Sequence, residues 1–225
     1  MKTQKIAART FGIFFILAFV SYGLGTGIVE STAGLSDSLT SINTNKFQLI
    51  IGVVLMALIH TIVNIGLPVI MIPILKQYNK TLSYGYLSAG IAATVTLIIG
   101  AVFIMMLVPL SAEYISADNA DSMHYETISM LLKKGNFYAY QIGMATWGLG
   151  GLMFCYLLLK SKLVPKVLAV LGTIGYLIFI AGTILELFGY SVGVILALPG
   201  GLFEICLSIW LIIKGFNNPE LNPKV

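Results

Sequence analysis

Six stretches of the chain are apolar, nearly free of charge and long enough to cross a lipid bilayer. The hydrocarbon core of a bilayer is about 30 Å thick and needs roughly 20 helical residues at about 1.5 Å each. The stretches exceed the ~10 residues of a barrel strand and do not alternate in polarity, so they predict helices. We therefore expect an all-α polytopic membrane bundle with about six transmembrane helices. The predicted helices cover residues 11–29, 47–75, 84–108, 137–159, 167–188 and 191–213, within a single domain over 1–225.

The composition agrees with this pattern and excludes several classes of protein. Hydrophobic residues make up 58% of the chain and charged residues 10%, against roughly 25% charged in soluble proteins. The net charge is +4, but the basic residues lie between the apolar stretches and form no patch, so nucleic acid binding is not expected. Cys155 and Cys206 both lie in apolar stretches without metal-ligand spacing, so we expect no disulfide framework, metal site or cofactor.

The distribution of Lys and Arg predicts the orientation of the chain. Ten of the 13 basic residues lie in the N-terminal segment, the second and fourth connections and the C-terminal tail, where Lys224 is the last. The other connections hold Lys46, Lys133 and Lys134, together with most of the acidic residues, including Asp37, Asp118 and Asp121. Because basic loops stay on the cytoplasmic side, both termini are predicted to be cytoplasmic.

The first apolar stretch follows Lys2, Lys5 and Arg9, as the core of a signal peptide does. It is long, and no small-residue cleavage pattern follows it, so an uncleaved helix is predicted.

The longest predicted connection is an outer loop over residues 112–136. Residues 122–134 carry Met123, Thr127, Met130 and Leu131 on one side of a short candidate helix, and the two lysines before Gly135 are typical of a helix C-terminus. Such a helix is expected to lie on the outer surface of the bilayer. A mobile acidic loop is the other interpretation of the same residues.

Several motifs in the last third of the chain occur in a recognisable order. They are Trp147-Gly148-Leu149-Gly150-Gly151, Leu159-Lys160-Ser161-Lys162-Leu163-Val164-Pro165-Lys166, Pro199-Gly200-Gly201-Leu202-Phe203-Glu204 and Ser208-Ile209-Trp210-Leu211-Ile212-Ile213-Lys214-Gly215-Phe216. In this order and spacing they resemble the bacterial multi-pass membrane family catalogued as domain of unknown function 4386. The similarity extends through 73–76 and 82–87 to nearly the whole chain.

The resemblance implies a small bacterial inner-membrane protein and brings no activity with it. Members of the family tend to carry an arginine and a glutamate early in the third helix, where this chain has Gly90 and Ala93. Any role of that ion pair is therefore absent here.

Three ionisable side chains, His60, Glu186 and Glu204, interrupt the predicted helices. Such groups cost about 2.5–3.5 kcal/mol each at the bilayer centre, so they face a bundle interior or a cavity. His60 and Glu204 each lie 13 residues from the outer end of their helix, which is about 20 Å. We expect them to meet near mid-bilayer, either to fix helix packing or as a protonatable, ligand-binding centre. Asn64 shares the face of His60 because it follows four residues later.

Two further features bear on this candidate site. Pro199, Gly200 and Gly201 precede Glu204 and predict a weakened, broken helix of the kind that opens binding sites in transporters. Glu186 lies near the outer end of the fifth helix and is interpreted either as the mouth of a path to Glu204 or as a carboxylate wetted by solvent. The pair Gly23 and Gly27, and the cluster Gly148, Gly150 and Gly151, predict close approach between helices.

No metalloprotease, nucleophile-elbow, P-loop or dinucleotide-binding motif occurs, and Asp is confined to predicted outer loops. Three hypotheses follow. The preferred one is a small transporter or ligand-binding membrane protein with His60, Asn64 and Glu204 lining the site. The alternatives are an intramembrane enzyme that uses His60 and Glu204 on a lipid or a helix, and a non-catalytic structural subunit. The predicted partners are the lipid bilayer and a small-molecule ligand.

Overall fold

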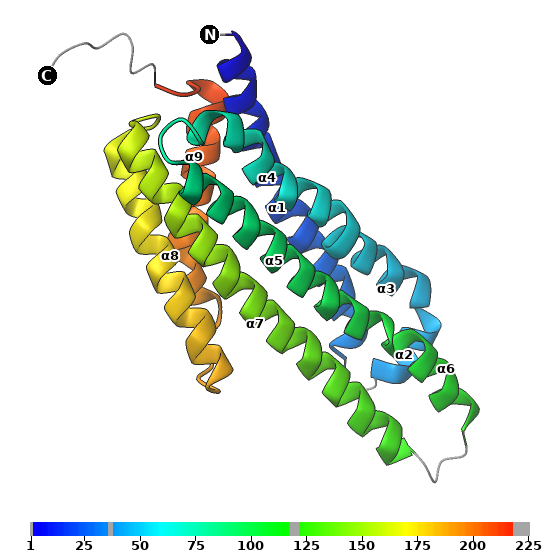
Figure 1. Cartoon of the computed structure of the whole chain (residues 1–225). Coiled ribbons are helices and arrows are strands. Elements are labelled where there is room, and N and C mark those ends of the chain that lie inside the picture. The colour runs from blue at the N-terminus through cyan, green and yellow to red at the C-terminus, as the bar shows by residue number, and fades with distance from the viewer. Residues whose placement is uncertain (1, 36–37, 118–121, 218–225) are drawn as a thin grey trace, which may run out of the picture. The chain divides into compact units, whose positions relative to one another are not determined.

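The computed structural model describes residues 2–35, 38–117 and 122–217, and these residues form helices and turns without a strand (Figure 1). The predicted all-α fold is confirmed. Asp37, Asp118, Asp121 and Lys224, which entered the orientation prediction, lie outside the described residues. Six helical segments among the described residues are long and apolar enough to cross a membrane, as predicted: Gln4–Ala33, Lys46–Leu75, Lys80–Ser116, Met123–Ser161, Lys166–Leu187 and Ile195–Ile213.

The first, third and fourth spanning segments extend beyond the apolar stretches that predicted them, whereas the last begins at Ile195, after its predicted start at 191. A π-helical segment, Val54–Ile59, lies between α3 and α4, and a 3₁₀ segment, Gly193–Ala197, precedes α9. The α-helices are α1 (Lys2–Ala33), α2 (Ser38–Thr44), α3 (Lys46–Val53), α4 (His60–Leu75), α5 (Lys80–Met105), α6 (Leu107–Ser116), α7 (Ser122–Ser161), α8 (Lys166–Leu187) and α9 (Leu198–Ile213). The three longer segments differ because backbone hydrogen bonding continues into polar residues that hydropathy counts as loop.

The described residues form two compact units. Unit 1 takes the described parts of Met1–Ala18, Val63–Thr94 and Gln141–Val225, and unit 2 takes those of Phe19–Ile62 and Val95–Tyr140. Each unit has its own buried apolar cluster. The predicted single domain over residues 1–225 stays a prediction.

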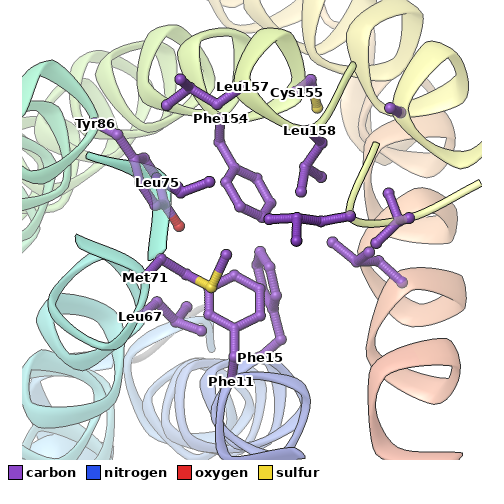
Figure 2. Packing of buried hydrophobic residues seen from close by; sticks show 14 of the residues in the cluster. Phe11, Phe15, Leu67, Met71, Leu75, Tyr86, Phe154, Cys155, Leu157 and Leu158 are labelled. Carbon is purple, nitrogen blue, oxygen red and sulfur yellow. The ribbon is translucent and has the colours of Figure 1, made fainter. Parts of the chain in front are cut away.

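The core of unit 1 is built largely from aromatic rings. Phe154 of α7 lies 5.3 Å from Phe11 of α1 and 5.0 Å from Tyr86 of α5, measured between ring centroids. Figure 2 shows Phe154 pointing toward Phe11, with Leu67 and Met71 of α4 nearby. α8 and α9 lie side by side, and a Cβ built on Gly175 would be 2.9 Å from the backbone nitrogen of Gly200. Glycine at these positions therefore permits close contact of the two helices.

In unit 2, residues 122–134 are not a separate interfacial helix or a loop. They form the first turns of α7, which continues without a break to Ser161 (Figure 1). Gly135 does not end the helix: a Cβ built there would lie 2.9 Å from the ring of Phe103 on α5, so the glycine makes room for that ring. Residues 118–121 of the predicted outer loop are outside the described residues.

The glycines confirm close packing at some predicted positions and not at others. A Cβ built on Gly148 would lie 2.6 Å from Ile180, and one on Gly151 would overlap the ring of Tyr176. Gly23 and Gly27 are different, because within the described residues nothing apart from the adjacent residues and the backbone of the same helix lies within 4 Å of a Cβ built on either. The close approach in α1 is made instead by Gly25, where a Cβ would lie 2.7 Å from the carbonyl oxygen of Gly52.

Large apolar side chains remain exposed along the helices. On α1 they include Ile13, Val20 and Leu24, with exposed fractions of 47%, 46% and 57%. A soluble protein rarely exposes apolar surface continuously along its helices. These side chains are suited to acyl chains.

Candidate functional site

Glu204 of α9 lies buried in unit 1 and is held by two aromatic donors. The hydroxyl of Tyr176 on α8 donates to Oε1 of Glu204 at 2.5 Å, and the indole Nε1 of Trp147 on α7 donates to the same oxygen at 3.3 Å. All three side chains are at most 9% exposed. Glu204 therefore joins three helices through one carboxylate oxygen.

The surroundings of this carboxyl group are aromatic and closely packed. Tyr86 and Cys155 are buried within electrostatic range of Glu204. The Tyr86 hydroxyl has no hydrogen-bond partner within the described part of the chain. Gly151 admits the Tyr176 ring, since any Cβ there would overlap it, and so allows the Tyr176 hydroxyl to reach Glu204.

Sequence analysis did not assign Trp147 and Tyr176 to the site. Trp147 opens the Trp-Gly-Leu-Gly-Gly motif, and at 6% exposure it is buried within the protein. The glycines after Trp147 could have indicated a large side chain such as Tyr176 at this site, because small residues on one helix leave space for a large side chain on its neighbour. Which large side chain fills that space depends on helix pairing.

Asn64 of α4 is buried in unit 1 and links two helices. Its amide nitrogen donates to the Thr94 hydroxyl of α5 at 2.9 Å, and that hydroxyl donates to the Gly90 carbonyl at 2.7 Å. The prediction that Asn64 faces the protein interior is consistent with its 4% exposure.

Pro199, Gly200 and Gly201 lie at the start of a helix. The 3₁₀ segment changes to α-helix at Leu198, and the three residues form the first turn of α9. Proline is tolerated there because its missing N–H has no intrahelical partner in the first turn. The predicted weak point is therefore a change of helix type, and an opening at Glu204 stays a prediction.

Glu186, near the end of α8, accepts a hydrogen bond at 2.6 Å from the backbone N–H of Gly193. Gly193 has φ +59°, a backbone conformation that favours glycine. This contact holds the turn between α8 and the 3₁₀ segment. A role of Glu186 at the mouth of a path stays a prediction.

His60 lies in unit 2, directly after the π-helical segment. A hydrogen-bond contact of 3.4 Å joins its Nδ1 to the Ser21 hydroxyl of α1, and the Tyr22 ring lies 5.0 Å away between centroids. Tyr22 in turn stacks on Tyr140 of α7 at 5.8 Å. Turns of π-helix are frequent at functional sites, and this one ends at the residue before the buried imidazole.

A cavity of about 560 Å³ adjoins these rings within unit 2. Tyr22 and Tyr140 line it on the side of His60, while Glu30 and Lys133 line it toward the end where α1 stops. Glu30 and Lys133 are within electrostatic range of each other. The wall also contains Thr26 and Asn136. A set of polar groups thus surrounds a space inside an apolar helical unit.

The predicted site residues therefore fall into two groups. Glu204, Asn64 and Glu186 belong to unit 1, and His60 belongs to unit 2. His60 and Asn64 lie four positions apart on α4, as predicted. A meeting of His60 with Glu204 stays a prediction. Among the described residues, no group of three or more His, Cys, Asp or Glu side chains is arranged to hold a metal ion.

The six long apolar helices found among the described residues, their exposed apolar surface and the buried polar clusters define a multi-pass integral membrane protein. The profile of the family described as Domain of unknown function (DUF4386) matches residues 10–215, so the chain belongs to this family, as its motifs predicted. No curated protein and no solved structure matches the chain.

Proposed function

We propose that the protein is a bacterial inner-membrane transporter or ligand-binding protein, with both termini in the cytoplasm, that takes a small polar solute into the cavity of unit 2. The cavity itself carries this proposal. Its volume of about 560 Å³ lies in the range of small-molecule sites, ~300–1,000 Å³. Tyr22, Thr26 and Tyr140 line the cavity within the spanning segments, where polar groups are costly, so their gathering around one space supports function.

In this proposal His60 is the protonatable group behind the cavity. The imidazole contacts Tyr22, which lines the cavity, so protonation of His60 alters the electrostatic potential at the bound solute. With the N-terminus inside, α1 ends outside, and the cavity opens toward the outer side of the membrane.

For Glu204 and Asn64, the contacts favour the hypothesis that these residues fix helix packing. Both make buried hydrogen bonds between helices of unit 1, as polar residues do when they stabilise membrane bundles. We therefore propose that Glu204 stabilises unit 1, and that solute binding depends on the cavity residues.

The test is solute binding by the purified chain in non-ionic detergent, screened as a thermal shift against amino acids, sugars, nucleosides and organic acids. For any solute that binds, Tyr140→Phe and Thr26→Val are expected to weaken affinity about three- to tenfold, because each removes a hydroxyl from the cavity. Thr146→Val is the matched control, since the Thr146 hydroxyl bonds to its own helix.

Glu204→Gln separates the two hypotheses. Unchanged solute affinity in Glu204→Gln supports the cavity as the binding site. The proposal is contradicted if Glu204→Gln loses binding while Tyr140→Phe and Thr26→Val keep the wild-type affinity, and this result would favour a midplane pair of His60 with Glu204. Absence of a shift with every solute in the panel also contradicts the proposal.

A further inference from the structure

A second cavity of about 420 Å³ lies in unit 2, lined by α2, α6 and the first turns of α7. It shares Lys133 and Phe137 with the cavity described above, and its other lining residues are different. Neither the predicted site residues nor the proposed function involves it.

One wall of this cavity carries a buried hydroxyl with no partner. Ser129 of α7 is 4% exposed, and its Oγ makes no hydrogen bond within the described residues. Buried hydroxyls in proteins are almost always hydrogen-bonded, because desolvation without a partner costs free energy. The hydroxyl oxygen itself is closed off from the cavity, so a ligand acceptor there would supply the missing partner only after rotation of the Ser129 side chain.

The same wall carries two ammonium groups. The Nζ of Lys133 donates to the Ser38 hydroxyl at 2.8 Å, which leaves two of its N–H groups and the Ser38 hydrogen as further donors. Lys134 also lines the cavity, and Glu126 is the acidic side chain among the described lining residues. Two ammonium groups thus face one carboxylate among the described lining residues, while Glu30, which lines only the solute cavity, offsets part of the Lys133 charge.

The rest of the lining is apolar. Leu35, Met130 and Phe137 contribute to it and are 53%, 51% and 38% exposed. The cavity thus offers an apolar wall beside a cluster of cationic and hydroxyl donors.

We propose that this cavity binds a phosphate ester with an apolar chain, its phosphate oxygens held by Ser38, Ser129, Lys133 and Lys134. Four donor side chains suit the several oxygens of a phosphate better than the two of a carboxylate. The same chemistry is found in a soluble phosphate ester and in a phospholipid headgroup.

The test uses the full chain in non-ionic detergent with octyl phosphate, measured by calorimetry, and octyl glucoside as the uncharged analogue. Octyl phosphate is expected to bind and octyl glucoside not to. Lys134→Ala is expected to weaken binding about tenfold. Lys46→Ala, which removes an exposed lysine of unit 2 outside the cavity lining, is expected to leave binding unchanged.

Two further variants are expected to have effects that misfolding cannot produce. Ser129→Ala is expected to raise the unfolding temperature without ligand, because it removes an unpaired buried hydroxyl, and to weaken octyl phosphate binding. Glu126→Gln is expected to tighten binding about threefold by removing repulsion, a gain that unfolding cannot produce.

A second arm identifies the source of the phosphate. The protein is placed in phosphatidylcholine nanodiscs with or without phosphatidic acid, and retained lipid is measured by mass spectrometry. Retention of phosphatidic acid by the wild type and not by Lys134→Ala indicates a lipid headgroup, whereas octyl phosphate binding without retention indicates a soluble ester. Wild-type affinity for octyl phosphate in both Lys134→Ala and Ser129→Ala, or no binding in either arm, overturns the proposal. Since these variants lie outside the solute cavity, either proposal can fail without the other.

Discussion

At the scale of single residues, Glu204 shows how a carboxyl group is accommodated in an apolar helical unit. Both hydrogen bonds described for its side chain come from aromatic donors, Tyr176 and Trp147. A phenol and an indole bring large apolar surfaces with one polar atom each, so they satisfy the carboxyl oxygen while keeping the surroundings apolar.

We expect Tyr176→Phe to destabilise the protein, because the Glu204 oxygen loses its shorter hydrogen bond while the ring remains. Hydrogen bonds between membrane helices contribute about 1 kcal/mol, so the unfolding temperature in detergent should fall by a few degrees. Tyr156→Phe on α7 is the control, because Tyr156 is 52% exposed. Equal unfolding temperatures for the two variants would show that the bond to Glu204 contributes nothing.

At this scale, the sequence indicated which polar side chains are buried and not which groups they contact. His60, Asn64 and Glu204 were predicted to turn inward, and their exposed fractions are 8%, 4% and 9%. That much follows from the cost of polar groups in lipid. Their contacts with Ser21, Thr94 and Tyr176 depend on how helices are rotated against one another, which uniformly apolar sequence does not reveal.

At the scale of elements, small residues decide where helices approach. Gly25 of α1 lies against the backbone of Gly52 on α3 and of Met56 in the π-helical segment. Gly23 and Gly27, two positions away on either side, have open space instead. Residues two apart point in different directions on a helix, so neighbouring glycines need not share a function.

We expect Gly25→Ala to destabilise unit 2 by about 1–3 kcal/mol, because the new methyl group meets rigid backbone atoms and the helices must move apart. Thermal unfolding in detergent measures the change. In contrast, Gly27→Ala should leave stability within about 1 kcal/mol of the wild type or improve it, since alanine favours helix. The packing described for Gly25 is wrong if the two variants unfold at the same temperature.

The ends of elements were predicted less well than their presence. Hydropathy predicted six spanning helices because the bilayer requires a minimum apolar length. Lys133, Lys134 and Gly135 then suggested a helix end, although α7 continues through them. The glycine that mimics a C-cap instead accommodates Phe103, a tertiary contact that local sequence does not encode.

At the scale of the whole molecule, α7 is much longer than the membrane is thick. Its 40 residues correspond to about 60 Å, twice the ~30 Å of the hydrocarbon core. Lys133 and Lys134 lie about 12 residues from its start, at the point where a charged side chain can reach the membrane surface. The first turns of α7 are therefore expected to project beyond the hydrocarbon, on the side predicted to be outside.

The orientation is tested with a membrane-impermeant maleimide on intact bacterial cells. The Met123 side chain on α7 is 75% exposed, so a cysteine introduced by Met123→Cys should be labelled in intact cells. A cysteine introduced by Lys160→Cys should be labelled only after permeabilisation. The unmodified chain is the control for background, because Cys155 and Cys206 both lie within spanning segments. The reverse labelling pattern would place both termini outside.

The π-helical segment Val54–Ile59 also has a consequence for how this protein tolerates insertions and deletions. A π-helical turn accommodates one residue more than an α-helical turn does. Deleting a single residue there is expected to convert the segment to regular α-helix and leave the flanking helices in register. Deleting one residue from the α-helical turns before it would instead rotate everything that follows by about 100° and turn the imidazole of His60 away from Tyr22. This short segment is therefore the place in the second spanning helix where loss of one residue is expected to be tolerated, with His60 still facing Tyr22.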